Sequence, residues 1–130
     1  MKATTGLIRL DPDKLAGLGL DKLAPYPDET VLSGESEHER WEFDHGQLFV
    51  GAYQAKAAKL ALENYPYDEF MYLLSGKIQI TDKRGKIETF HPGQGLILKK
   101  GFTGTFEMIG NVRKIAIVAG EQYTSPKDSN

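Results

Sequence analysis

The stretch YPYDEFMYLLSGKIQI, residues 65–80, decides the predicted fold of this chain. It predicts a β-strand, a turn at Gly76 and a second β-strand. The run that follows Asp68 and Glu69 is apolar on both faces, which is typical of a strand covered on both sides. A carboxylate beside such a strand marks either an active site or an exposed strand end.

Further short strands are predicted on both sides of this stretch, from Trp41 onward. The chain has 14 glycines with short runs of Val, Ile, Phe and Tyr between them, which favours strands over helices. The predicted strands lie in QLFVGAYQA (47–55), in KIQITDKRGKIETF (77–90) on both sides of the hairpin signal DKRG, and in LILKKG (96–101), FTGTFEMI (102–109) and VRKIAIVAG (112–120). HPGQG (91–95) is a second predicted turn, and AKAAKLALEN (55–64) is compatible with a helix, a strand or a loop. This order of short strands and glycine turns indicates an antiparallel sandwich or barrel.

The first 40 residues have a different character. Asp11 is a predicted N-cap, and Pro12 is the first residue of a predicted short helix. Residues 24–40 are rich in Pro, Ser and Glu and are predicted to form a surface loop. We therefore predict an N-terminal extension over 1–40 that packs on the barrel, a β-barrel over 41–120 and a flexible tail over 121–130.

Composition narrows the class of protein. A chain of 130 residues fits one domain, and the absence of cysteine excludes disulfides and thiolate chemistry and fits a reducing compartment. The net charge is −2 and no basic stripe is present, so we expect no nucleic-acid partner. The apolar runs are too short to cross a bilayer, and the N-terminus lacks the apolar segment of a secretion signal. We expect a soluble, cytoplasmic protein without a membrane partner.

Several of these residues also match the spacing of a known family. Glu69 is followed after six residues by Gly76, and Gly93 and Gly101 fit the frame of a second motif. Over about residues 41–118 the chain resembles the cupin group that includes the ethanolamine-utilisation Q proteins and the ureidoglycine aminohydrolase-type cupins. The resemblance implies an all-β double-stranded β-helix, or jelly roll, with a short helical N-terminal extension.

The metal ligands expected from this resemblance are largely missing. A conventional cupin site uses two histidines and a glutamate from the first motif and one histidine from the second. The positions of the lost histidines are those of Glu63 and Tyr65, or Leu62 and Asn64, and Gly104. Only Glu69 remains, and one carboxylate does not hold a transition metal against water. We expect no cofactor, and the alternative is an unconventional divalent-metal site that draws on His38, His45 and His91 with Glu63 or Glu69.

Strand alternation predicts which side chains face the interior. If Glu69 points inward, as the resemblance implies, Met71 and Leu73 do the same, and Tyr65 and Tyr67 join them by extrapolation. Phe70, Tyr72 and Leu74 then face outward, against another sheet or against the partner subunit of a homodimer. On the later strand Gly104, Phe106 and Met108 share one face.

Three residues carry open alternatives. Glu69 is the best catalytic candidate, or it is a structural carboxylate held by a tyrosine, a lysine or a backbone amide. Lys114 either pairs with Glu69 and binds ligand or is a solvated lysine at a strand end. Gly104 either enlarges a pocket or permits close packing. For Trp41, Tyr53 and Tyr123 packing is favoured over a place at a pocket mouth.

The favoured function is metal-free binding of a small polar metabolite in the barrel interior. The predicted ligand-binding residues are Tyr65, Tyr67, Glu69, Met71, Phe106 and Lys114. The alternatives are a metal-dependent aminohydrolase or lyase-type enzyme with substitute ligands, and a non-catalytic accessory protein. Whether the chain is an enzyme stays open, because a fold of this kind hosts many activities.

Overall fold

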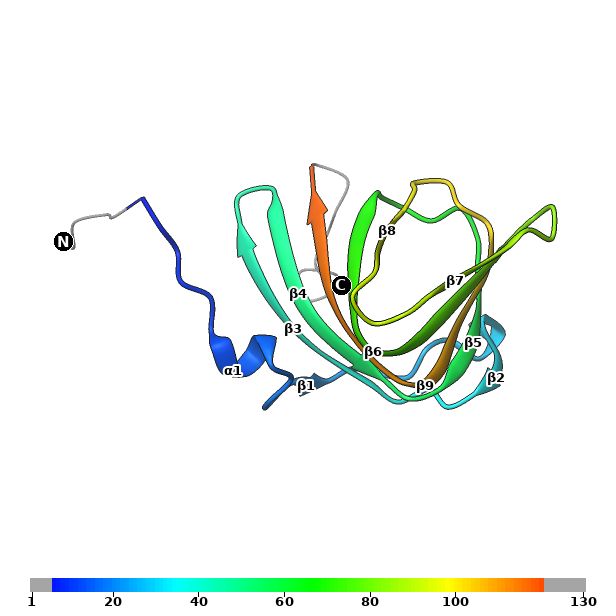
Figure 1. Ribbon diagram of the computed structural model, residues 1–130, viewed down its shortest axis with the longest axis horizontal. Coiled ribbons are helices and arrows are strands. Elements are labelled where there is room, and N and C mark those ends of the chain that lie inside the picture. Colours follow the sequence, from blue (N-terminus) through cyan, green and yellow to red (C-terminus); the bar gives the residue numbers. More distant parts are fainter. Residues whose placement is uncertain (1–5, 121–130) are drawn as a thin grey trace.

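The computed structural model describes residues 6–120, which form an antiparallel β-structure that curls around one interior (Figure 1). The helical elements are short: α1 (Pro12–Leu15) and the 3-10 turn η1 (Asp28–Thr30). The strands are β1 (Asp21–Lys22), β2 (Val31–Gly34), β3 (His38–His45), β4 (Leu48–Ala55), β5 (Ala58–Leu62), β6 (Glu69–Asp82), β7 (Ile87–Phe90), β8 (Gly95–Leu98) and β9 (Gly104–Ala119). The predicted all-β barrel is confirmed. None of the helices within residues 6–120 is long and apolar enough to cross a membrane.

The long strands β6 and β9 run antiparallel to each other and join two groups of shorter strands. At the start of β6, Glu69 lies opposite Val118 of β9. Here β8 pairs with β6, and β4 pairs with β9. At the other end Asp82 lies opposite Gly104, and here β7 pairs with β6 and β5 pairs with β9. Strand β3 continues from β4, and β1 and β2 lie at the two edges.

The predicted turn at Gly76 is wrong, because β6 continues through this residue. The register between β6 and β9 shifts on either side of Ser75: β6 has the extra residue before Ser75, and β9 has the extra residues after it, so the ladder is bulged here and the chain does not turn. Gly76 has a φ of +81°, and a Cβ at this position would lie 2.5 Å from the Asn111 carbonyl oxygen. The separate strands predicted over 102–109 and 112–120 are likewise one strand, because β9 runs without interruption through Gly110.

The segments flanking the barrel correct two further predictions. The open prediction for 55–64 resolves to a strand, β5. The loop predicted over 24–40 instead contains η1, β2 and the start of β3. Strand β2 forms at the sheet edge because β5 supplies its backbone hydrogen bonds, although most of its side chains stay exposed. The Asp11 N-cap is confirmed, since its carboxylate accepts bonds from Asp13 N and Lys14 N.

The predicted hairpin is present, and strand pairing connects the predicted N-terminal extension to the barrel. The DKRG hairpin is confirmed, with the Asp82 carboxylate accepting from the backbone N–H groups of Arg84 and Lys86. Strands from the predicted N-terminal extension pair with the barrel at β1–β3 and β2–β5, and β3 crosses its predicted boundary at residue 40. The predicted tail over 121–130, with Tyr123, lies outside the described residues.

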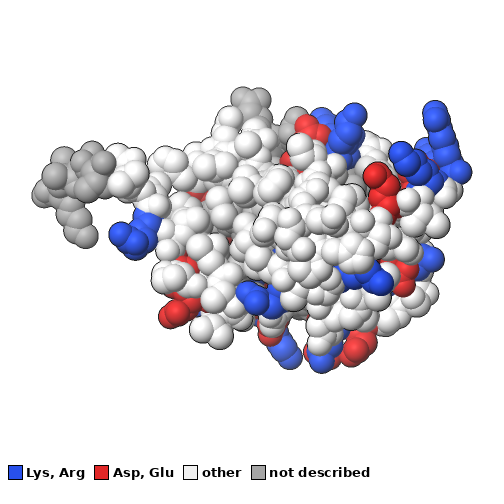
Figure 2. All heavy atoms as spheres, viewed as in Figure 1, with Lys and Arg blue, Asp and Glu red and all other residues white. Residues whose placement is uncertain are grey.

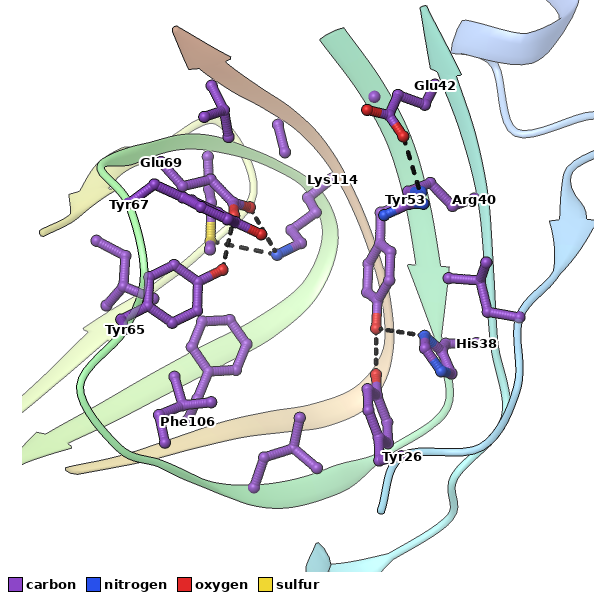
Figure 3. Close-up of a pocket in the computed structure, with 18 of the residues that line it drawn as sticks. Tyr26, His38, Arg40, Glu42, Tyr53, Tyr65, Tyr67, Glu69, Phe106 and Lys114 are labelled. Carbon is purple, nitrogen blue, oxygen red and sulfur yellow. Dashed lines mark hydrogen bonds and ion pairs between the residues drawn. The ribbon is translucent and has the colours of Figure 1, made fainter. Parts of the chain in front are cut away.

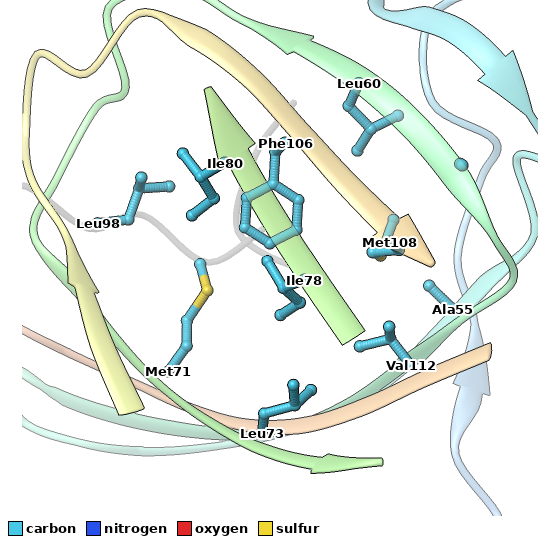
Figure 4. Close-up of a cluster of buried hydrophobic side chains, with 11 residues drawn as sticks. Ala55, Leu60, Met71, Leu73, Ile78, Ile80, Leu98, Phe106, Met108 and Val112 are labelled. Carbon is cyan, nitrogen blue, oxygen red and sulfur yellow. The ribbon is translucent and has the colours of Figure 1, made fainter. Parts of the chain in front are cut away.

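A cluster of buried apolar side chains fills one part of the interior (Figure 4). Its members project from β4, β5, β6, β8 and β9 toward one another, because alternate residues of each strand face inward. They are Ala55, Ala58, Leu60, Met71, Leu73, Ile78, Ile80, Leu98, Phe106, Met108 and Val112. The remaining part of the interior holds polar side chains and is described below.

The charged residues lie mostly near the outline of the molecule in the view of Figure 2. Lys and Arg are interspersed with Asp and Glu, and a broad central area of this face carries uncharged residues. This distribution agrees with the near-neutral net charge of −2.

Candidate functional site

The interior next to the apolar cluster contains a cavity of about 420 Å³ (Figure 3). All six residues predicted to bind ligand line it: Tyr65, Tyr67, Glu69, Met71, Phe106 and Lys114. Further polar side chains line it from the N-terminal part of the chain and from β3 and β4: Tyr26, His38, Arg40, Glu42 and Tyr53. The cavity therefore joins a polar group of side chains to the wall of the apolar core.

Alternation along β6 places the predicted residues as expected. Glu69 and Met71 are buried, whereas Phe70 and Tyr72 between and beyond them are about two-fifths exposed on the outer side. The outward prediction for these aromatic residues is confirmed. Tyr65 lies before β6, where its backbone pairs with Phe102 and Gly101, and from this position its ring reaches Glu69.

Glu69 has partners of the kinds that the sequence suggested. The Tyr65 hydroxyl donates to Glu69 Oε1 over 2.7 Å, and Lys114 Nζ lies 3.7 Å from Glu69 Oε2. Burial raises the pKa of Tyr65 strongly, and the neighbouring carboxylate raises it further, so the hydroxyl keeps its proton. A protonated tyrosine is thus the direct hydrogen-bond donor to the carboxylate.

The prediction of a solvated Lys114 is wrong, since the residue is only 7% exposed. Lys114 lies in the middle of the sheet, opposite Leu73 of β6 and Tyr53 of β4, and not at a strand end. Its Nζ lies 3.3 Å from Met71 Sδ and 4.9 Å from the centroid of the Tyr53 ring. Burial lowers the pKa of Lys114, and the Glu69 carboxylate only partly opposes this.

A second polar group connects Tyr26, Tyr53 and His38 across the cavity wall (Figure 3). The Tyr26 and Tyr53 hydroxyls bond to each other, and the Tyr53 hydroxyl lies 3.1 Å from His38 Nδ1. His38 Nε2 lies 2.7 Å from the Ala24 carbonyl oxygen, which only accepts, so Nε2 carries the proton. Nδ1 of the neutral ring then accepts from Tyr53.

The charge state of His38 follows from its surroundings. Burial lowers the pKa of His38; the Ala24 bond acts in the opposite direction, and the Arg40 charge lowers it again. The Tyr26 ring stacks on the imidazole with a centroid distance of 4.0 Å. The neutral imidazole is the form that fits this hydrogen-bonded chain.

An ion pair on β3 completes the polar lining. Arg40 and Glu42 lie two residues apart on the inner face, with Arg40 Nη2 3.3 Å from Glu42 Oε1. The sequence did not predict the ion pair between Arg40 and Glu42. It also did not predict that Tyr26 and His38 face the cavity. The signal was present in HERWEFDH, where polar residues alternate with Trp41 and Phe43.

The residues at the family's metal positions do not fit a metal ion. Within residues 6–120 no three histidine or acidic side chains come together in a group that could hold one. His45 and His91 are exposed, far from the buried setting of Glu69. At Gly104 a Cβ would lie 2.1 Å from the Thr81 carbonyl oxygen, so this glycine permits close packing and does not enlarge the cavity.

The fold is similar to that of several solved structures at low sequence identity. A protein of unknown function of the DUF861 family from Pseudomonas syringae pv. tomato is 17% identical, with a TM-score of 0.65 over 77% of this chain and 44% of that chain. This chain thus spans less than half of that protein. EutQ of Clostridium difficile is 16% identical, with a TM-score of 0.59 over 78% of this chain and 83% of that chain. The likeness shows a shared fold.

Two other comparisons concern sequence alone. None of the curated proteins is similar enough to this chain to count as a match. The family model described as an EutQ-like cupin domain matches residues 46–116, which is more than half of the chain. The predicted resemblance to the cupins is confirmed by this match and by the jelly-roll fold, and the chain belongs to the family of EutQ-like cupin domains.

Proposed function

We propose that this chain binds a small polar metabolite inside the barrel with its own side chains and without a metal. The supporting observation is the cavity of about 420 Å³, in which polar groups from four strands and the N-terminal segment face an apolar wall. Ligand sites in proteins have this combination of a concave apolar surface and a few fixed polar groups.

The charges in the cavity limit the chemistry of the ligand. Two cationic side chains line it, Arg40 and Lys114, and each lies near a carboxylate, Glu42 or Glu69. A ligand with a net charge would leave part of this group unbalanced in a buried place, which is costly. The favoured ligand is therefore neutral or zwitterionic, with hydroxyl or carbonyl groups for the tyrosines and a small apolar part for Met71 and Phe106.

The alternatives receive less support from the described residues. A metal-dependent aminohydrolase or lyase would need a ligand set that the residues around Glu69 do not supply. An accessory protein that uses the fold for contacts alone would not need an interior cavity lined by paired polar groups. Binding in the interior accounts for both observations.

A panel of polyols, hydroxy acids, amino acids and small carbonyl compounds tests the proposal. We expect a compound of the panel to raise the thermal midpoint with saturation and to show contact in ligand-observed NMR. The variant Ala116→Leu, which fills part of the cavity, should lose this binding. Ala119→Leu on the exposed side of the same strand is the matched control and should keep it.

Two results would overturn the proposal. One is binding that is equal in both leucine variants, because it would place the ligand elsewhere. The other is binding that a chelator abolishes together with the loss of stoichiometric metal in elemental analysis, because it would establish the metal-dependent alternative.

A further inference from the structure

The amino group of Lys114 has an unusual environment for a lysine in a cavity (Figure 3). Nζ lies 3.3 Å from the Met71 thioether sulfur, and the carboxylate oxygen Glu69 Oε2 lies farther away at 3.7 Å. The ring centroids of Tyr53 and Phe106 lie 4.9 and 5.2 Å from Nζ.

This environment favours a neutral amine more than water does. An ammonium group has three donors to satisfy, and a thioether is a weak acceptor. Burial lowers the pKa of Lys114, which enlarges the fraction of neutral amine at neutral pH. A desolvated lysine in an apolar pocket is the form in which enzymes use this side chain as a nucleophile.

Groups that can move protons lie beside the amine. Glu69 Oε2 faces Nζ, and the other oxygen of the same carboxylate accepts from the Tyr65 hydroxyl over 2.7 Å. A carboxylate within reach can take a proton from nitrogen and return it to a leaving hydroxyl. The cavity thus holds a nucleophile and an acid–base pair next to an open space of about 420 Å³.

We infer that Lys114 captures a small aldehyde or ketone in this cavity as a reversible imine. The inference rests on the proposed binding function and names the reactive group of the ligand. The Nζ lone pair forms a bond to the carbonyl carbon as the C=O π bond breaks, and Glu69 carries one proton from nitrogen to the oxygen, which becomes a hydroxyl. Glu69 then carries the second nitrogen proton to this hydroxyl, and the C–O bond breaks to release water as the C=N bond forms. Amine and carbonyl become imine and water, and no oxidant or reductant is needed.

Reductive trapping tests the inference. The protein is incubated with glycolaldehyde or hydroxyacetone and sodium cyanoborohydride, and the adduct is located by intact mass and peptide mapping. We expect one dominant adduct at Lys114, formed faster than at any exposed lysine, because the lowered pKa of this buried amine leaves more of it neutral. Lys114→Arg, which keeps the charge, and Lys114→Met, which keeps the approximate length, should both abolish it.

Matched variants separate the roles of the residues. Lys86→Arg, at an exposed lysine of the β6–β7 hairpin, should leave the adduct at Lys114 unchanged. Glu69→Gln should keep Lys114 in place but slow trapping, because an amide cannot shuttle the proton. Circular dichroism of each variant confirms that it folds, and either Lys114 variant suffices for the test.

The outcomes distinguish this inference from the proposed function. Adducts spread over exposed lysines, or an unchanged adduct mass in the Lys114 variants, would overturn the imine. If the cavity then still binds compounds without a carbonyl, and Ala116→Leu still blocks them, the proposed function stands alone. If neither trapping nor binding is found, both fail.

Discussion

Glu69 contacts both Lys114 and Tyr65 in the cavity, so each of the three side chains affects the environment of the others. A carboxylate in a buried place requires donors, and here they are a tyrosine hydroxyl at 2.7 Å and a more distant ammonium. The Lys114 Nζ has cation–π contacts with two rings and lies against a thioether. Burial nevertheless lowers the pKa of Lys114, and this shift has a measurable consequence.

The stability of the protein should rise with pH more steeply with Lys114 than without it. The folded-state pKa of Lys114 lies below the ordinary value of 10.5, so between these values the unfolded chain binds more protons. The free energy of unfolding then increases with pH by up to about 1.4 kcal/mol per unit. Urea unfolding between about pH 7 and about pH 9, below the usual tyrosine range, should show this slope in the wild type and lose it in Lys114→Met.

Lys86→Met provides the comparison for this slope, because Lys86 is exposed on the hairpin. It should keep the wild-type dependence on pH. Equal slopes in the wild type and both variants would mean that Lys114 is as well solvated in the folded protein as in the unfolded chain.

At the scale of the elements, Gly76 permits the irregular pairing between β6 and β9. Gly76 combines a φ of +81° with a distance of 2.5 Å between a hypothetical Cβ and the Asn111 carbonyl oxygen. Gly85 has a similar φ of +85° but nothing within 4 Å of its hypothetical Cβ. A side chain would strain the backbone at both glycines. Only at Gly76 would its Cβ also clash with the neighbouring strand.

Gly76→Ala should destabilise the protein more than Gly85→Ala does. The left-handed backbone alone costs about 1–2 kcal/mol for a residue with a Cβ, and we expect this loss at Gly85. At Gly76 the backbone of β9 must also move, which should bring the total above about 3 kcal/mol. Urea unfolding measures both, and equal losses would show that β9 yields without cost.

The sequence predicted some elements and missed others for identifiable reasons. The family resemblance implied the inward position of Glu69, and the inward positions of Met71 and Leu73 then followed from alternation within a single strand, which is a local property. The burial of Lys114 did not, because it depends on β9 lying between β4 and β6 with Lys114 opposite Tyr53 and Leu73. Gly76 looks like a turn in the sequence because a bulge and a turn both require a positive φ.

The polar residues of β3 show the same limit. Arg40 and Glu42 alternate with Trp41 and Phe43, but this alternation alone does not tell which face is inward. In a typical barrel the apolar set would face the interior, whereas here Trp41 and Phe43 lie on the opposite face from the cavity. Only the pairing with β4, where Arg40 lies opposite Tyr53, fixes the orientation.

For the whole molecule, the apolar outer face leads us to expect a homodimer. Phe70 of β6 lies opposite Ile97 of β8 and Ile117 of β9, and Tyr72 lies opposite Ile115, so these residues share the outer face. Ile97 is 63% exposed and Tyr72 is 40% exposed. A contiguous apolar sheet face of this kind is typical of an interface, and a twofold pairing would cover it in both copies.

Size-exclusion chromatography with light scattering measures the expected dimer. Ile97→Glu should shift the protein to the monomer, because the new charge would be buried without a partner. Ile87→Glu is the control, since Ile87 is 57% exposed on β7, which pairs with the other half of β6. A wild-type protein that elutes and scatters as a monomer would contradict the expectation.

The origin of the cavity lining has a consequence for how such proteins diverge. The family match covers residues 46–116, whereas Tyr26, His38, Arg40 and Glu42 come from the chain before it. The matched barrel contributes the apolar wall together with Glu69 and Lys114, and Met71 and Phe106 in that wall also belong to the buried core. Substitutions there disturb folding, so ligand preference is freer to evolve in the preceding segment. Relatives that share the barrel therefore need not share the ligand. Those with different N-terminal strands would bind different molecules against the same apolar wall.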